Sequence, residues 1–158
     1  MPISALDEID YKILKIMQED ARLSNVDLAE QVGLSPSPCL RRLRRLEDDG
    51  IIDGYTTVVD QSRVGLPVSV FVSVALKEQS EGALEEFEEA VMALPEVMEC
   101  YLMTGTSDYL LRVVTPDLVG YEKFLKHNLT GIPAIASIQS SFALKQVIYR
   151  SALPIGQP

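Results

Sequence analysis

The stretch LSPSPCLRRLRRLE, residues 34–47, contains the strongest pattern in the chain. Four of the five residues from Arg41 to Arg45 are arginines, although the 158-residue chain has a formal net charge of -9. A partner meets the local patch and not the total charge, so this reversal of sign favours an anionic partner such as DNA. The alternative is a solvated helix face, because arginine is a good helix former. Four arginines without interleaved glutamates repel one another, however, which makes solvation alone a poor reason for the cluster.

The same stretch begins like a helix. Ser35 can cap with its hydroxyl, and Pro36 at the first helical position loses no useful N–H. An apolar stripe follows at helical spacing: Cys39, Leu43 and Leu46. The arginines lie roughly opposite this stripe, apart from Arg42 at its margin. The pattern predicts a helix with its back in a core and its cationic face toward an anionic partner.

Two further helices are predicted ahead of this one. Residues 6–19 have apolar positions at helical spacing, with Asp10 on the same face. A carboxylate that points inward needs a cationic or N–H partner, so we expect Arg42 or Arg22 to pair with Asp10. Ser24 begins a stretch similar to a capping box, and the short helix that follows ends at Gly33. A short helix, a turn with glycine and a second helix with a basic face make a helix-turn-helix.

The segment after the basic helix predicts a wing and a linker. Gly50 ends the helix, and residues 51–59 have the composition of two short β runs about a turn. We therefore assign residues 1–59 to a winged helix-turn-helix domain. Residues 60–66, with Gly65 close to Pro67, form the expected linker.

Residues 67–150 have a different pattern and predict a second domain. Apolar residues alternate with small ones from Val68 to Leu76, as in a strand. Helical spacing follows in residues 81–94 and again after Asp117, and the remaining strands are expected at residues 97–104, 109–114 and 135–148. The order βαββαβ predicts a ferredoxin-like antiparallel sheet with both helices on one face, and so an α+β chain. The bare face of such a sheet is most simply buried against a second copy, which predicts a homodimer.

The composition excludes several other classes of protein. The longest apolar run, residues 64–76, is too short for a membrane span and is interrupted by polar residues and a proline. Two distant cysteines and a single histidine give no disulfide framework and no metal-ligand pattern, so we expect no metal and no cofactor. No secretory or transit pattern opens the chain, and a cytoplasmic location is expected.

Taken together, the motifs resemble those of the Lrp/AsnC family, the leucine-responsive or feast/famine regulators of bacteria and archaea. The similar stretches are LDEIDYKIL at 6–14, DLAEQVGLS at 27–35, RLRRLE at 42–47, GII at 50–52 and TGTSDYLL at 104–111. The resemblance spans nearly the whole chain. It implies a transcriptional regulator, not an enzyme, with a winged helix-turn-helix, a hinge and a βαββαβ domain. It also implies dimers formed through the sheets, further assembly into octamers, and a small effector, usually an amino acid, bound between dimers.

Candidate site residues follow from the basic helix and from the resemblance. A recognition helix presents its N-terminal residues to the major groove, so Ser37, Pro38 and Arg41 are expected at base edges. We expect Arg44 and Arg45 at phosphates and Arg42 chiefly in the fold. The full set of DNA-contacting candidates is Ser24, Ser35, Ser37, Pro38, Arg41, Arg42, Arg44 and Arg45. The resemblance implies an effector pocket lined by Gly105, Thr106, Ser107, Asp108 and Ser140.

The glycine loop at residues 105–108 has two interpretations, as an effector site and as a simple turn. Glycine lets backbone N–H groups approach a carboxylate, and Asp108 could accept from an ammonium group. The same sequence is typical of a hairpin turn with a local aspartate cap. Ile138 stands where family members that bind polar amino acids often have threonine, which favours an apolar effector.

Two rival functions remain open at this point. The chain could be a regulatory subunit of an enzyme of amino-acid metabolism, with a protein-docking first half. It could also be an architectural protein that compacts DNA with little sequence preference.

Overall fold

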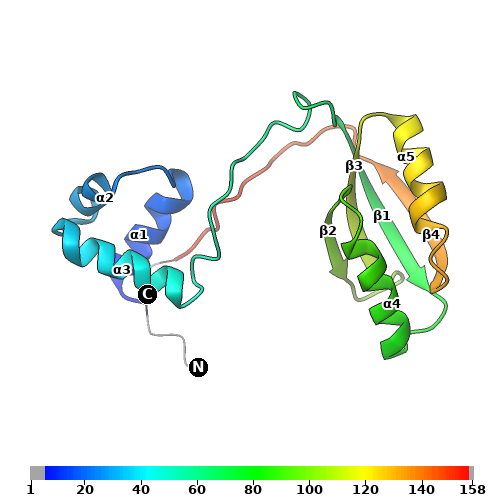
Figure 1. Ribbon diagram of the computed structural model, residues 1–158, viewed down its shortest axis with the longest axis horizontal. Helices are drawn as coiled ribbons and strands as arrows, with labels where there is room; N and C mark the ends of the chain where they lie inside the picture. The colour runs from blue at the N-terminus through cyan, green and yellow to red at the C-terminus, as the bar shows by residue number, and fades with distance from the viewer. Residues whose placement is uncertain (1–5, 157–158) are drawn as a thin grey trace. The chain divides into compact units, whose positions relative to one another are not determined.

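The computed structural model describes residues 6–156. Their contacts divide the chain into two units: the chain up to Thr57 together with the tail from Val147, and the segment Val58–Gln146 (Figure 1). The expected linker, residues 60–66, thus lies within the second unit, while residues 147–150 group with the first. No helix in the described part is long and apolar enough to cross a membrane.

The first unit contains three helices, α1 (Glu8–Glu19), α2 (Asn25–Val32) and α3 (Pro36–Asp48). Gly33 ends α2 with a φ of 76°, a left-handed conformation that glycine adopts without steric cost. The helix-turn-helix prediction is confirmed. The buried apolar side chains of the three helices form one core: Ile13, Leu14, Met17, Leu28, Ala29, Val32, Cys39 and Leu46.

The two predicted wing strands are not formed: residues 51–59 contain no strand. The N–H groups of Ile51 and Ile52 instead both donate to the carbonyl of Leu46, each at 3.0 Å, and so cap the end of α3. Both isoleucine side chains pack against the core of the first unit. Ile51 and Ile52, which helped to predict a strand, therefore close a helix and extend the core.

The second unit is a four-stranded antiparallel sheet covered by helices. Its strands are β1 (Val68–Leu76), β2 (Val97–Leu102), β3 (Tyr109–Thr115) and β4 (Ile135–Phe142), in the order β2-β3-β1-β4. The helices are α4 (Glu81–Met92) and α5 (Leu118–Phe124), and a π-helical turn, η1 (Leu125–Leu129), continues α5. This arrangement confirms the ferredoxin-like βαββαβ prediction and the α+β class.

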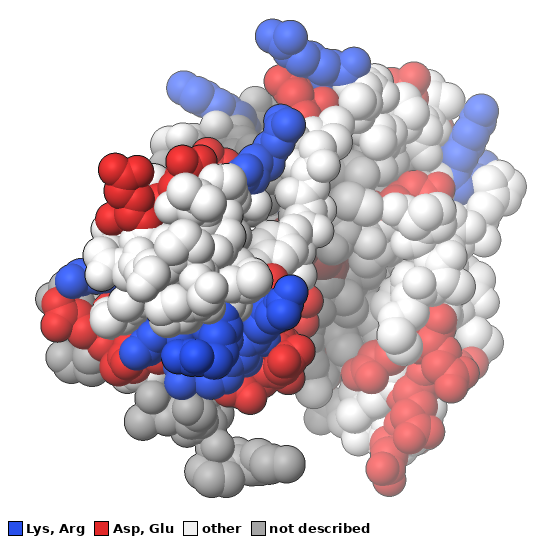
Figure 2. Space-filling view, turned by 60° about the vertical axis from the view of Figure 1, so that its left-hand side comes forward, with Lys and Arg blue, Asp and Glu red and all other residues white. Residues whose placement is uncertain are grey.

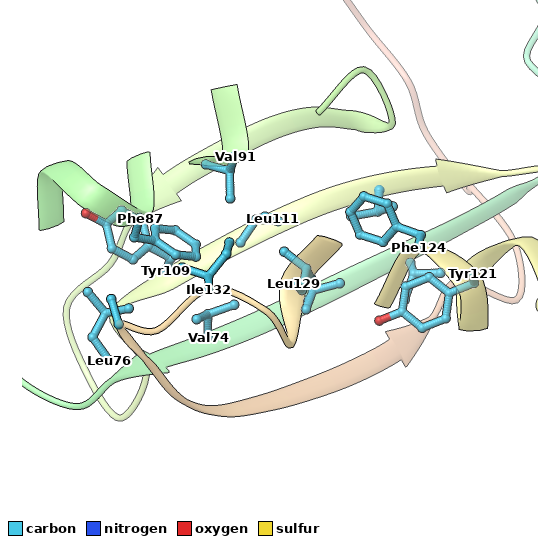
Figure 3. Packing of buried hydrophobic residues seen from close by; sticks show 14 of the residues in the cluster. Val74, Leu76, Phe87, Val91, Tyr109, Leu111, Tyr121, Phe124, Leu129 and Ile132 are labelled. Carbon is cyan, nitrogen blue, oxygen red and sulfur yellow. The ribbon is translucent and has the colours of Figure 1, made fainter. Parts of the chain in front are cut away.

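The core of the second unit lies between the sheet and these helices. Val70, Val72 and Val74 of β1 are fully buried there, whereas Phe71 between them is 39% exposed. Figure 3 shows Phe87 of α4 against Tyr109 of β3, and the two ring centroids are 4.4 Å apart. Among residues 6–156 no helix covers the opposite face of the sheet, although Gln61 reaches it and bonds to Ser69 and Arg112 (Figure 1).

The last strand ends earlier than the sequence predicted, at Phe142 and not at Ile148. Phe142 lies opposite Val70, and the N–H of Ala143 still donates to the carbonyl of Ser69 at 3.0 Å. The partner strand begins at Val68, so the residues beyond have no strand to pair with. A favourable strand composition does not suffice where the partner strand is missing.

Candidate DNA-binding surface and effector loop

The turn between α2 and α3 fixes the position of the basic helix. The side-chain amide of Asn25, at the start of α2, donates to the carbonyl of Pro36 at 2.7 Å. Ser24 caps α2: its hydroxyl accepts from the N–H of Asp27 at 3.1 Å and donates to the Asp27 carboxylate at 2.6 Å. Ser24 was a candidate for contact with DNA, and in the free chain its hydroxyl serves the helix cap.

The N-terminal end of α3 presents polar groups that have no partner within the helix. Ser35 is the N-cap residue, but its hydroxyl makes no capping hydrogen bond, contrary to the expectation from the sequence. Pro36 and Pro38 have no N–H, so the backbone donors left at this end belong to Ser35 and Ser37. Both serines are exposed. Their hydroxyl and N–H groups can therefore bind an anion without breaking an existing helix cap.

The four arginines of α3 fall into two pairs. Arg42 and Arg45 are half-buried and bind carboxylates of α1 and its N-cap. Arg41 and Arg44 are exposed and form no ion pair among residues 6–156. They line a shallow open groove together with Ser37, Leu40, Arg45, Asp48 and Asp49. Figure 2 shows basic side chains gathered on one face of the first unit, with acidic ones beside them.

Asp10 is the centre of the ion-pair network that holds Arg42 and Arg45. Asp10 is fully buried, and one of its carboxylate oxygens lies 2.9 Å from the Arg42 guanidinium. The other oxygen accepts from the Arg45 guanidinium and from the backbone N–H of Asp7, the latter at 3.1 Å. The predicted Asp10–Arg42 pair is thus confirmed. Arg45, which we expected at phosphates, also pairs with Asp10 in the free chain, because α1 lies close enough for both arginine side chains to reach it.

Asp7 completes the network and was not among the residues predicted from the sequence. Its carboxylate accepts from the backbone N–H of Asp10 at 2.9 Å and from Arg42 at 2.7 Å. The N–H of Asp10, followed by Arg42, lowers the pKa of the Asp7 carboxyl. Asp7 in turn is the main cause of a raised pKa for Arg42. The signal that could have revealed Asp7 is the Asp-x-x-Asp spacing, which allows a reciprocal capping box at the start of α1.

The glycine loop at residues 105–108 connects β2 to β3. Gly105 has a φ of 120°, which residues with a side chain rarely adopt, and open space surrounds the position of a Cβ. Asp108 is half-buried, and its carboxylate accepts from the Leu76 N–H and from the Gln79 side-chain amide, each at 2.7 Å. These contacts join the loop to the end of β1. Asp108 is therefore a structural residue of the free chain, whatever else it binds.

Ile138 and Ser140 lie on β4, on the other side of β1 from the glycine loop. Val74 of β1 pairs with Ile138, while its carbonyl accepts from the N–H of Asp108 at 2.8 Å. The Ser140 hydroxyl is hydrogen-bonded to the Tyr121 hydroxyl of α5. β1 thus separates the two parts of the effector set within a single chain.

A helix-turn-helix with free arginines, followed by a separate βαββαβ unit with a glycine loop, defines a class of protein: DNA-binding regulators with their own ligand-binding domain. Comparison with known protein families supports this assignment to DNA-binding regulators. A model of the Lrp/AsnC ligand binding domain matches residues 69–153, and a model of winged helix-turn-helix DNA-binding matches residues 6–53.

Characterised relatives match over nearly the whole chain. The Bkd operon transcriptional regulator of Pseudomonas aeruginosa is 50% identical over 97% of this chain and 100% of its own length. The leucine-responsive regulatory protein of Escherichia coli is 39% identical over 98% of this chain and 94% of its own. The chain belongs to the Lrp/AsnC family of DNA-binding transcriptional regulators. Since these relatives are regulators, the protein is not an enzyme, which removes the first rival function.

Solved structures of the same family are also similar. A transcriptional regulator from Neisseria meningitidis, crystallised as a complex with L-Met, superposes with a TM-score of 0.91 at 40% identity, over 95% of this chain and 97% of that one. An AsnC family regulator from Agrobacterium tumefaciens gives a TM-score of 0.90 at 44% identity, over 94% and 97% of the two chains.

Proposed function

We propose that this regulator binds operator DNA sequence-specifically through the front of α3, and that an amino acid controls its DNA occupancy or its assembly. The observation that supports specific binding is the division of the arginines: Arg41 and Arg44 are free, whereas Arg42 and Arg45 already have carboxylate partners. Arg41 stands one helical turn from Ser37, at the end of the helix that enters the major groove.

In this proposal the DNA-contacting residues have different tasks. Ser37, Pro38 and Arg41 meet base edges, while Arg44 and the Ser35 hydroxyl meet phosphates. Arg42 and Arg45 chiefly hold α3 against α1, and their outward N–H groups add positive potential near the backbone of the DNA. Ser24 contributes through the cap that positions α2.

The amino-acid part of the proposal is supported by the regulator from N. meningitidis, which was crystallised with L-Met. It is also supported by the charge of Asp108. Both known partners of its carboxylate are neutral, so its negative charge is not compensated and can attract an ammonium group. Gly105, Thr106 and Ser107 supply backbone N–H groups for a carboxylate, and the apolar Ile138 favours an apolar side chain.

We further propose that the chain forms homodimers through the bare face of the sheet, and that these dimers assemble further, for example into octamers. Phe71 and Tyr101 are exposed apolar side chains on that face that a second copy could cover. In a higher assembly the edge strand β4, with Ile138 and Ser140 of one subunit, can approach the glycine loop of another. A protein that controls transcription acts where the DNA is, so a cytoplasmic location belongs to the same proposal.

Fluorescence anisotropy tests the DNA-binding part. A duplex selected from a random pool with the wild-type protein is compared with a scrambled duplex, over a range of salt concentrations. Arg41→Ala should cost about 1–3 kcal/mol and relax the preference at one base pair in each half-site. Arg44→Ala should weaken both duplexes alike and reduce the salt slope by roughly one unit. Equal wild-type affinity for the two duplexes would support the architectural rival.

Calorimetry tests the effector part, with L-methionine, L-leucine and L-aspartate as probes. The apolar amino acids should bind better than aspartate. Asp108→Ala should reduce affinity more than tenfold, since a charge-assisted contact contributes about 1.5–3 kcal/mol. Gly105→Val should also abolish binding, because the φ of 120° strains any residue with a side chain. Undiminished binding to Asp108→Ala would remove the loop from the site.

A further inference from the structure

The C-terminal tail packs against the DNA-binding unit through a short, well-defined contact. The backbone of Leu153 is bonded twice to the side-chain amide of Gln18, in the last turn of α1. The Leu153 N–H donates to Gln18 Oε1 at 2.6 Å, and Gln18 Nε2 donates to the Leu153 carbonyl at 3.3 Å. Ile155 is half-buried against the same core that holds the three helices together.

The contacting segment Leu153-Pro154-Ile155 is a preformed turn. The N–H of Ile155 donates to the carbonyl of Leu153 at 2.8 Å, which closes a three-residue turn about Pro154. Proline fixes φ near the value that such a turn requires, so little conformational freedom is lost when the segment docks. The turn directs Ile155 into the core while the Leu153 side chain remains 68% exposed.

The tail gives the DNA-binding unit a second connection to the rest of the chain, made by the docked turn and not by a covalent bond. The chain leaves this unit after Thr57, forms the whole second unit, and returns to the first at Val147. The returning segment begins directly after β4, the strand that contains Ile138 and Ser140. Residues 143–150 have no strand or helix and are exposed, so they act as a tether between β4 and the docked turn.

We propose that residues 153–155 form a clasp on α1 that restrains the rotation of the DNA-binding unit relative to the ligand-binding domain. A unit attached at one point can rotate about its linker, whereas a unit attached at two points has far fewer orientations. A short tether also keeps the docking segment at an effective concentration on the order of millimolar, so a modest contact is enough to keep the clasp closed. Any change at β4 is then transmitted to α1 through the tail as well as through the linker.

Time-resolved fluorescence anisotropy of the full chain tests the clasp without DNA or effector. A dye is attached at Glu30→Cys, an exposed position of α2, in a Cys100→Ser background. Burial raises the pKa of the Cys39 thiol, so this second cysteine stays unlabelled. Ile155→Ser and Gln18→Met should each increase the amplitude of the fast segmental component. Leu153→Ala is the matched control, because it keeps the bonded backbone and removes only an exposed side chain.

An unchanged decay in Ile155→Ser and Gln18→Met would overturn the proposal, as would an equal increase in Leu153→Ala. Hydrogen exchange on the wild-type chain keeps the test decisive if a variant fails to fold. The amide of Leu153 should exchange much more slowly than that of Leu144, whose residue is 99% exposed. Equal exchange at these two amides would show that the clasp is open in solution, and would also overturn the proposal. Neither result depends on whether the protein binds an amino acid.

Discussion

Asp10 in the first unit and Asp108 in the second each join separate segments of the chain, and the two carboxylates differ in their partners. Asp10 in the first unit is fully buried and binds two guanidinium groups of α3. Asp108 in the second unit is half-buried and binds a backbone N–H and a neutral amide. The charge of Asp10 is therefore balanced by two cations within the fold, whereas both partners of the Asp108 carboxylate are neutral groups. The two carboxylates thus differ more in the charge of their partners than in the structural role they have in the free chain.

The largest effect should come from removing the charge of Asp10. Asp10→Asn leaves Arg42 and Arg45 without their buried counter-ion, and breaking a buried pair costs about 3–5 kcal/mol. The loss should lie near the lower end, because 27% and 38% of the two arginine side chains are exposed. Urea unfolding followed by helical circular dichroism measures it. Asp108→Asn is the matched variant of the second unit and should cost less, since the Leu76 N–H can still find an oxygen acceptor.

The next prediction concerns the arginines on the other side of this network. Arg42→Ala and Arg45→Ala should each lower the stability of the first unit by about 1.5–3 kcal/mol, the usual contribution of a hydrogen bond to a charged group. Arg44→Ala should leave stability unchanged, because its side chain is exposed and unpaired in the described chain. Differential scanning calorimetry of the three variants checks this. A stable Arg45→Ala protein would return Arg45 to the phosphate-contacting group.

Local patterns predicted most of the fold. The three helices of the first unit and the alternation in β1 follow from periodicities of 3.6 and 2, which depend only on neighbouring residues. The buried Asp10 could be predicted for the same reason, since it interrupts the apolar face of its own helix. Its pairing with Arg42 followed from the position of that arginine at the margin of the apolar stripe.

Asp7 was missed although its capping-box spacing is local, but the other features that the sequence did not reveal depend on tertiary packing and pairing. The strand expected up to Ile148 ends at Phe142 because β1 begins at Val68 and offers no further partner. Ile51 and Ile52 close α3, and their side chains pack against the core beside them. The bond between Gln18 and Leu153 joins residues 135 positions apart, and nothing near either residue indicates it.

A smaller effect should follow from changing the neutral partner of Asp108. Gln79→Ala removes one hydrogen bond from the carboxylate and should lower the stability of the second unit by about 0.5–1.5 kcal/mol. The effect is limited because Gln79 is exposed and water can replace its amide. Unfolding followed by near-ultraviolet circular dichroism, which reports on buried tyrosines such as Tyr109, measures the change. A loss as large as that of Asp10→Asn would contradict the contrast between the two carboxylates.

The smallest effect should be the pH dependence contributed by Asp7. Contacts with the Asp10 N–H and with Arg42 lower the pKa of Asp7 in the folded chain, so the ionised form stabilises the fold. This contribution is complete above the pKa of the unfolded chain, roughly 3.9, and is lost as the pH falls through the lower folded value. Asp7 is 51% exposed, which limits the contribution to about 0.2–1 kcal/mol.

Asp7→Asn isolates this charge, because asparagine caps a helix about as well as aspartate does. The wild type should be more stable than the variant at neutral pH, and the difference should disappear as the pH falls below about 4. Urea unfolding of both proteins over a series of pH values, in low salt, measures the difference. A gap that persists into acid would mean that Asp7 stabilises α1 through its cap geometry alone. The ion pair with Arg42 would then contribute nothing measurable, and the charge of the network would reside in Asp10 and its two arginines.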